Sequence, residues 1–277
     1  MTLAPFPREK AFLQVGMNFA EGRSMKDQLY LFAKASFPFL VLLIAWWTVS
    51  ASGWYPQSLF VSPYQVSQSL VELIASDELQ IHLGISLQRL GFGLAIGSSI
   101  GLLFGVLMAV SKNFHTATSP LFNMVRQVPS VALIPILILI LGIGEAFKVV
   151  IIVKAAFFPV ALAAFEAVKG IPATYIEVAR AYKLPRRTVL FKVMLPATVP
   201  DIITGIRLAA GRSWGTLVAA ELIASEAGIG QMMEFGRQMF RMEVVMLGLI
   251  ITGLVGFALD RGLLWMESRL TIWKGAQ

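Results

Sequence analysis

The chain has 277 residues, a formal net charge of +7 and no cysteine. Apolar residues make up 57% of it and charged residues only 14%, against roughly 45–50% and 25% in soluble domains. This composition excludes an ordinary soluble domain and indicates an integral membrane protein, while the lack of cysteine excludes disulfides and thiolate metal sites. We attribute the positive charge to cytoplasmic loops rather than to nucleic-acid binding.

The N-terminal region combines a polar, basic tail at residues 1–36 with a first apolar run at 37–49. A cleavable signal peptide is the rival interpretation, because small residues follow the run. The tail is long for a signal-peptide n-region, and the pair Trp46-Trp47 suits a membrane interface. We therefore predict a retained span, followed by an external segment.

The external segment at residues 54–80 contains no Lys or Arg, and it is expected to hold a short helix near 66–75. A second span is predicted at about 87–110. Its small residues recur at every fourth position, and they are Gly93, Gly97, Gly101 and Gly105. A stripe of this kind is typical of helices that pack closely in lipid.

Four further spans follow, at about 121–141, 148–167, 202–223 and 244–263. A short basic turn at 111–118 precedes the third span, which Pro129 and Pro135 interrupt. With six spans, both termini lie on one side. The segments on that side carry fifteen Lys and Arg, while the opposite segments carry only Arg237 and Arg241. This asymmetry predicts that both termini are cytoplasmic.

A long polar loop at residues 172–200, here named the central loop, separates the fourth and fifth spans. Its spacing predicts two short amphipathic helices. The first opens at Pro172 and stops at Leu184, because a residue before proline disfavours the helical conformation. The second opens at Pro185 and ends at Leu195-Pro196. Two such helices between spans indicate a docking surface.

The central loop resembles the EAA loop of the membrane subunits of binding-protein-dependent ABC importers. That pattern reads Glu-Ala-Ala, three residues, Gly, nine residues, then Ile-x-Leu-Pro. Here Glu177-Val178-Ala179 is followed at the same distances by Lys183 and by Val193-Met194-Leu195-Pro196. Lys183 is the main departure, because a Gly between helices usually serves as a cap with positive φ. A lysine there costs roughly 1 kcal/mol or selects another turn.

The resemblance implies an all-α integral membrane protein with about six transmembrane helices, the type I ABC importer permease fold. It covers residues 87–264. The segments at 87–91, 127–130 and 229–232 are similar to a subgroup that serves aliphatic sulfonates, taurine and nitrate. The implied organisation is a cytoplasmic tail at 1–36, a first span and external segment at 37–80, a permease core of five spans at 81–266 and a cytoplasmic tail at 267–277.

The resemblance also implies partners in a bacterial inner membrane. Two cytoplasmic ATPase subunits would bind ATP and Mg, so we expect no cofactor or metal on this chain, which lacks a P-loop. A second permease copy, in a homodimer, and a periplasmic or lipid-anchored binding protein would complete the importer. Leu195 and Pro196 are expected to shape the loop. The residues expected to contact the ATPase are Tyr175, Glu177, Val178, Ala179, Ala181, Tyr182, Lys183, Leu184 and Pro185.

Charges within spans are the remaining clue to the solute, because they are costly in lipid and usually mark function. Lys154 lies about two turns into the fourth span, where it either contacts an anion or pairs with an acid. Four arginines, Arg89, Arg126, Arg207 and Arg212, lie toward span ends, where snorkelling is a sufficient explanation. Arg89 and Arg126 also resemble positions that are basic across the family regardless of solute, which favours a structural role for both. The polar residues of the fifth span expected to face a pathway are Ser213, Trp214, Thr216 and Glu221.

We expect a small anionic solute, first of all an aliphatic sulfonate or taurine. Nitrate, bicarbonate, an aromatic carboxylate and a thiamine-precursor pyrimidine are the alternatives. A secondary transporter would need internal symmetry and ion-coupling acids at the midplane, and the sequence has no clear repeat. A structural membrane protein would not need the EAA spacing. No catalytic motif occurs, and the isolated His82 and His115 receive no role, so an independent enzyme is not expected.

Overall fold

The computed structural model describes residues 25–54, 56 and 60–270, and within them the chain is helical with no strand. The all-α prediction is therefore confirmed. The chain forms two compact units, residues 1–64 and 65–277. Residues 1–24 of the predicted N-terminal tail and residues 271–277 of the predicted C-terminal tail lie outside the described residues.

The first unit contains α2 (Met25–Ala51), which begins well before the apolar run predicted from the sequence. Its apolar part, Ser36–Ala51, is shorter than the helices that qualify as membrane spans. The indole nitrogen of Trp46 donates a hydrogen bond of 3.0 Å to the carbonyl of Val61. This bond ties the end of α2 to the segment that follows it.

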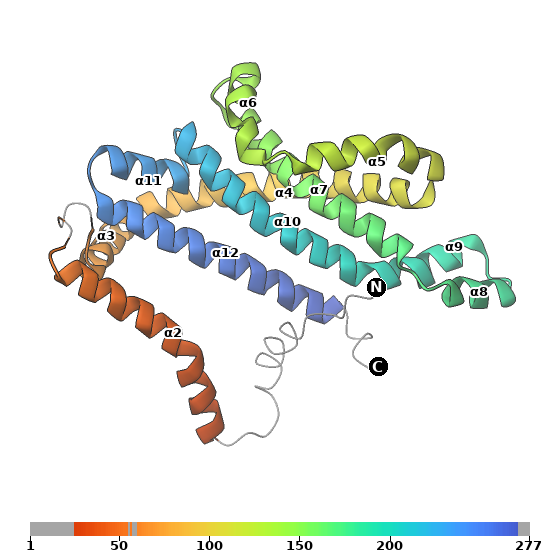
Figure 1. The fold of residues 1–277 in the computed structure, drawn as a ribbon, viewed down its shortest axis with the longest axis horizontal. Helices are drawn as coiled ribbons and strands as arrows, with labels where there is room; N and C mark the ends of the chain where they lie inside the picture. Colours follow the sequence, from red (N-terminus) through yellow and green to blue (C-terminus); the bar gives the residue numbers. More distant parts are fainter. Residues whose placement is uncertain (1–24, 55, 57–59, 271–277) are drawn as a thin grey trace. The chain divides into compact units, whose positions relative to one another are not determined.

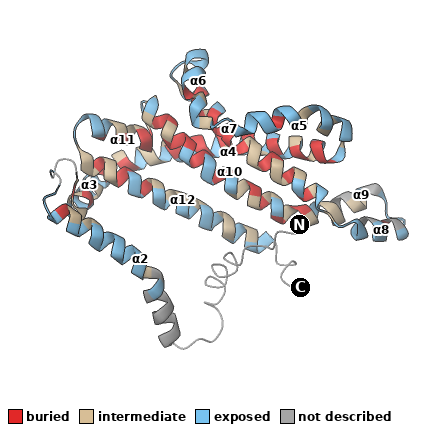
Figure 2. Cartoon of the chain, viewed as in Figure 1, coloured by how far each residue is buried: buried red, intermediate tan, exposed pale blue. Residues whose placement is uncertain are grey.

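The remaining helices are drawn in Figure 1. The external helix predicted near 66–75 is α3, and α7 packs against both α4 and α10. Figure 2 shows the buried residues concentrated along α4, α7 and α10. The bounds are α3 (Pro63–Ala75), α4 (Glu78–Val110), α5 (Lys112–Gln127), η1 (Ser130–Leu133), α6 (Ile134–Leu141), α7 (Glu145–Lys169), α8 (Ala173–Ala181), α9 (Arg186–Val189), η2 (Leu190–Met194), α10 (Leu195–Ile223), α11 (Ile229–Gln238) and α12 (Met242–Leu270).

Among the described residues, four helical segments are long and apolar enough to cross a membrane, and they are α4, α7, the run Arg187–Ile223 that ends with α10, and α12. The bent pair formed by α5 and the η1–α6 segment makes a fifth span if the pair is counted as one. By length and composition, the described residues thus support up to five of the six predicted spans. The first predicted span corresponds to the shorter apolar part of α2.

The predicted third span is not a straight helix. α5 already begins at Lys112, so the predicted basic turn is reduced to Ser111, whose hydroxyl caps α5 by accepting a hydrogen bond from the Phe114 N–H (3.3 Å). The chain then bends by 89° between α5 and the η1–α6 segment. Pro129 explains the break, because it has no N–H to continue α5 and forces Val128 into an extended conformation (ψ 118°).

The glycine stripe of α4 faces α7, as its spacing predicts. All four of its glycines are buried. A Cβ on Gly105 would lie 2.2 Å from the carbonyl oxygen of Ala161, and one on Gly101 would lie 2.6 Å from that of Phe157. Any side chain at these positions would therefore push the two backbones apart, which confirms the close packing of α4 on α7.

Candidate functional site

The central loop places α8 and α9 beyond the ends of α7 and α10 (Figure 1). Lys183, which follows α8, has a φ of +50°. The Leu184 N–H donates to the Ala179 carbonyl (3.0 Å), and the Tyr182 N–H donates to the Val178 carbonyl (3.0 Å). A six-residue closure around a left-handed residue is the Schellman cap that glycine usually makes. Lys183 therefore takes the glycine conformation instead of selecting another turn, at a cost of roughly 1 kcal/mol.

The second helix of the central loop does not end at Leu195-Pro196, and this prediction is wrong. α9 continues through the π-helix η2 directly into α10, in which Pro196 lies in the first turn. Within the segment Pro196 cannot donate a backbone hydrogen bond, and the π-helical turn η2 directly before it departs from the regular α-helical pattern. The loop and the fifth span are thus one continuous helical segment.

The central loop leaves large apolar side chains uncovered. Tyr175, Val178, Tyr182 and Leu184 are between 40% and 77% exposed, and Glu177 beside them is exposed as well. Ala179 is buried, while Ala181, Lys183 and Pro185 are exposed. Apolar side chains gathered with a charged residue at the tip of a loop are typical of a protein contact surface. The ATPase-contact role of these residues remains a prediction.

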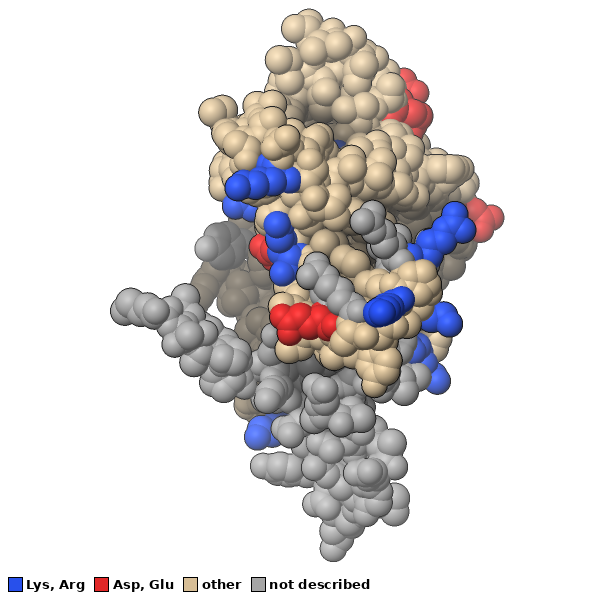
Figure 3. Space-filling model, turned by 90° about the vertical axis from the view of Figure 1, so that its right-hand side faces the viewer, with Lys and Arg blue, Asp and Glu red and all other residues tan. Residues whose placement is uncertain are grey.

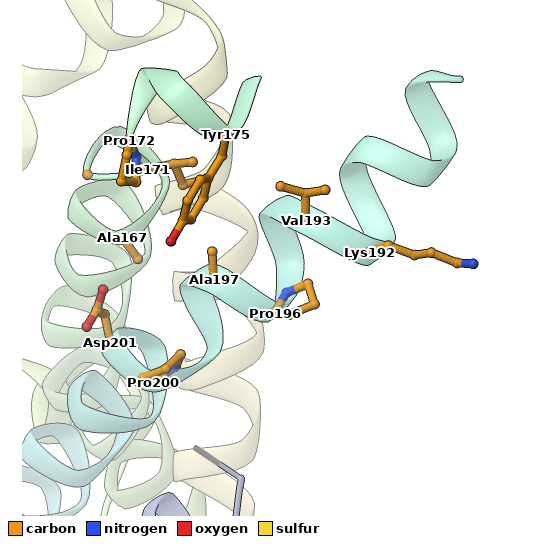
Figure 4. Close-up of a pocket in the computed structure, with 11 residues that line it drawn as sticks. Ala167, Ile171, Pro172, Tyr175, Lys192, Val193, Pro196, Ala197, Pro200 and Asp201 are labelled. Atoms are coloured by element: carbon orange, nitrogen blue, oxygen red, sulfur yellow. The ribbon is translucent and has the colours of Figure 1, made fainter. Parts of the chain in front are cut away.

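A cavity of about 540 Å³ lies between α8 and the start of α10. In Figure 4, Tyr175 points into this space toward Ala197, and the side chain of Lys192 points away from it. Figure 3 shows basic side chains spread over this end of the molecule, with few acidic ones among them. The loop therefore offers a hollow, apolar and basic surface.

An ion network joins α4, α7 and α10 toward the ends of these helices that lie away from the central loop. The side chains of Arg89 and Glu221 are buried, while that of Glu145 is 62% exposed. Arg89 donates to both carboxylate oxygens of Glu145, over 2.6 Å from Nε and 2.5 Å from Nη2, and its Nη1 donates to Glu221 (2.9 Å). Lys148 donates to Glu145 over 3.0 Å. Arg89 is only 7% exposed, so snorkelling is wrong for this residue, while the structural role that the sequence favoured agrees with its contacts.

The same network holds the segment between α10 and α11. The Glu221 carboxylate accepts hydrogen bonds from the Ser86 hydroxyl (2.9 and 2.8 Å) and from the Gly230 N–H (3.1 Å). The Gly228 N–H donates to Nδ1 of His82 (2.9 Å), which gives that histidine a structural partner. Gly228 has a φ of +119°, and a Cβ on it would lie 2.4 Å from the carboxylate. A side chain at position 228 would overlap the Glu221 carboxylate, so only glycine fits there.

A second cavity, here named the basic cavity, has a volume of about 430 Å³ and lies between the end of α5, η1, α7 and α10. The Lys154 Nζ donates to the carbonyl of Val128 and lies 5.7 Å from the centre of the Phe158 ring. The full lining is Arg126, Gln127, Val128, Pro129, Ser130, Val131, Lys154, Ala155, Phe158, Pro159, Gly211, Arg212, Gly215 and Thr216.

The family model described as "Binding-protein-dependent transport system inner membrane component" matches residues 101–272. The match covers more than half of the chain. This chain belongs to that family. It is therefore a permease subunit of an ABC importer, with several spans in a membrane.

Curated permeases resemble the chain over most of its length. The taurine transport system permease protein TauC of Escherichia coli is 34% identical over 240 residues, covering 85% of this chain and 87% of that protein. The Bacillus subtilis protein SsuC, named for aliphatic sulfonates transport, is 35% identical over 236 residues (85% and 86%). The nitrate import permease protein NrtB of Synechocystis is 30% identical over 238 residues (83% and 86%).

A solved structure of the MetNI methionine ABC transporter in inward-facing conformations has the same fold. The TM-score is 0.52 at 24% sequence identity, and the match covers 64% of this chain and 91% of that one. A second crystal form gives a TM-score of 0.50 at 23% identity. The predicted importer permease fold is thereby confirmed.

In this permease the predicted pathway residues fall into two groups. Lys154 and Thr216 line the basic cavity. Ser213 is fully buried and donates to the Ile152 carbonyl (3.5 Å), and Trp214 donates to that of Thr252 (2.9 Å) from within the core. Glu221 belongs to the ion network. These last three side chains support the packing between helices and do not line the basic cavity.

Sequence reasoning missed several residues of the permease that the network uses, above all Glu145 and Ser86. A usable signal was present, because Arg89 and Glu145 both lie at span ends on the same predicted side of the membrane, where an arginine needs a counter-ion. Arg207 follows the same logic, since it lies 3.8 Å from Asp260 and 3.9 Å from Glu267 of α12. Arg126 and Arg212 instead line the basic cavity.

Proposed function

We propose that this permease carries a small solute with an anionic head group across a bacterial inner membrane, first of all an aliphatic sulfonate or taurine. The relatives named for these solutes and for nitrate support an oxyanion. The observation that carries the choice is the basic cavity, in whose lining Lys154 has no acidic residue beside it. Nitrate and bicarbonate are the closest alternatives, because they carry the same charge.

We further propose that the central loop docks into a cytoplasmic ATPase subunit. Two such subunits would bind ATP and Mg, and their closure would move the central loops of two copies of this chain. The exposed apolar residues of α8 support this contact, because the chain itself leaves them uncovered. Glu177 lies between the exposed Tyr175 and Val178 in the sequence, and it is the loop residue whose substitution we expect to reduce uptake most.

The proposed orientation has both termini and the central loop in the cytoplasm, with the α10–α11 segment facing a binding protein outside. Its support is the distribution of basic residues. The two basic residues on the proposed outer side are both paired, Arg237 with Glu234 (2.6 Å) and Arg241 with Glu72 (2.7 Å).

The docking proposal is tested by reversing one charge in the central loop. Glu177→Lys is expected to leave the permease inserted in the membrane while uptake falls by at least about tenfold, because the ATPase contact is broken. The matched control is Glu166→Lys, which reverses an exposed glutamate in the last turn of α7. Uptake of labelled taurine, ethanesulfonate and nitrate, with co-purification of the ATPase, is the measurement.

The outcomes separate the two parts of the proposal. Wild-type uptake by Glu177→Lys would exclude the docking assignment, whatever the solute. Uptake of none of the three solutes by the intact importer would exclude the solute assignment and leave the docking surface standing. Growth of a deletion strain on single sulfur sources then separates sulfonates from nitrate, because only loss of a sulfonate importer abolishes growth on sulfonates.

A further inference from the structure

The basic cavity gathers three cations from three different helices. Arg126 comes from the last turn of α5, Lys154 from α7 and Arg212 from α10. A smaller cavity of about 240 Å³ adjoins it and is lined again by Arg126 and Arg212. Cations brought together from elements far apart in the sequence repel one another, so their convergence points to a negatively charged ligand.

The depth of these cations in the membrane strengthens this reading. With a rise of about 1.5 Å per residue, Lys154 lies roughly 14 Å from the first residue of α7, and Arg212 roughly 17 Å from the last residue of α10. Arg212 is nevertheless exposed on the surface of this chain. A guanidinium at such depth is too costly to face lipid, so this surface faces a water-filled space or the second copy.

The partners of the neighbouring arginines provide the contrast. Arg207 lies on the same helix as Arg212 and has Asp260 and Glu267 within 3.9 Å. Arg89 binds two glutamates. Among the described residues, in contrast, the lining of the basic cavity contains no Asp or Glu. Three cations without an acid among them leave charge available for a solute.

The rest of the lining is apolar and roomy. Val131, Pro129 and Phe158 form an apolar part of the wall, and the Phe158 ring lies 5.7 Å from the Lys154 Nζ. Gly211 and Gly215 lie one turn apart on α10, and a Cβ added to either would meet no atom within 4 Å. Glycines at these two positions therefore keep the space beside Arg212 open instead of packing against another helix.

We propose that Arg126, Lys154 and Arg212 bind the anionic head of the transported solute while the apolar wall receives its tail. The solute class is then a monoanionic alkanesulfonate, not a zwitterion such as taurine. An arginine fork matches two oxygens of an oxyanion, and Lys154 adds a point charge. The ammonium group of taurine would find only like charges in this lining. This inference rests on the proposed anion-importing function and narrows its solute.

The test uses trifluoromethanesulfonate, a sulfonate with an apolar end, as a fluorine NMR probe. Line broadening by the full-length permease in lipid nanodiscs reports weak binding without binding protein or ATPase. Arg212→Gln and Lys154→Gln are each expected to raise the apparent Kd of the probe at least tenfold, which corresponds to about 1.4 kcal/mol. Arg212→Lys, which keeps the charge but not the fork, should bind with intermediate affinity.

The matched control is Arg261→Gln, which removes one positive charge from α12, where Arg261 lies over the Phe257 ring and outside the basic cavity. This variant is expected to bind the probe like the wild type. Ethanesulfonate should displace the probe at a concentration at least tenfold lower than taurine. A size-exclusion profile that matches the wild type shows that each variant is folded.

Each result decides between the alternatives. Wild-type affinity in folded Arg212→Gln and Lys154→Gln would overturn the site. Equal displacement by taurine and ethanesulfonate would overturn the solute class. An importer that takes up neither a sulfonate nor nitrate would instead exclude the proposed function, and that measurement is independent of probe binding to the permease.

Discussion

Arg89 of α4 and Glu221 of α10 form an ion pair with 2.9 Å between Nη1 and Oε1, although their side chains are only 8% and 0% exposed. Glu145 of α7 binds the other side of the same guanidinium, so a single arginine joins three membrane helices. Removing one partner of a buried pair leaves an uncompensated charge, which typically costs about 3–5 kcal/mol. The stability of this end of the bundle thus depends on the pair.

Glu221→Ala is therefore expected to lower the free energy of unfolding by about 3 kcal/mol or more. Thermal denaturation of the full-length permease in detergent measures the effect. Glu226→Ala serves as the control, because Glu226 is an exposed acid five positions later in the chain. If both variants unfold at the same temperature, the network does not stabilise the fold.

The contact between α4 and α7 predicts opposite effects for two glycines of one helix. Gly105→Ala should destabilise the permease by roughly 1–3 kcal/mol, because the new methyl group would overlap the backbone of Ala161. Gly91→Ala should be neutral or stabilising by up to about 1 kcal/mol, because nothing lies within 4 Å of a Cβ there and alanine favours the helix. Comparing the two unfolding midpoints checks the prediction, and equal midpoints would contradict it.

The left-handed Lys183 predicts the behaviour of the loop between α8 and α9. Lys183→Gly should keep ATPase-coupled uptake at the wild-type level and relieve roughly 1 kcal/mol of backbone strain. Lys183→Val should reduce uptake severalfold, since a β-branched residue strongly disfavours positive φ. Uptake measured at equal permease levels decides the matter. Equal loss in both variants would mean that the lysine side chain, and not the turn, is what the loop needs.

The sequence was most informative where structure is determined locally. The four-residue spacing from Gly93 to Gly105 predicts which face of α4 packs against another helix. The prolines at 129 and 135 predict an interruption of the third span. The 89° bend itself depends on how η1 and α6 pack, which no local pattern encodes. The loop was predicted from its motif, but the passage through η2 into α10 was not, because Pro196 is equally compatible with ending a helix and with beginning one.

The ion network was missed for a different reason. Arg89 is separated from Glu145 by 56 positions and from Glu221 by 132, so only the packing of the helices brings them together. Near a span end, a lone arginine that snorkels and one that is buried between acids give the same sequence pattern. The same limit applies to Arg212, whose neighbours Gly211 and Gly215 become informative only when the space beside them is known.

The unbroken winding from α9 through η2 into α10 has a mechanical consequence. Arg212 lies about 33 Å along this segment from Leu190, at a rise of about 1.5 Å per residue. Under the proposed function, displacement of the central loop and widening of the basic cavity would belong to one movement of this segment, which contains the π-helical turn η2 and Pro200. One helical segment, without an intervening loop, would then connect the site of energy input with the solute, and its stiffness would determine how strongly the two are coupled.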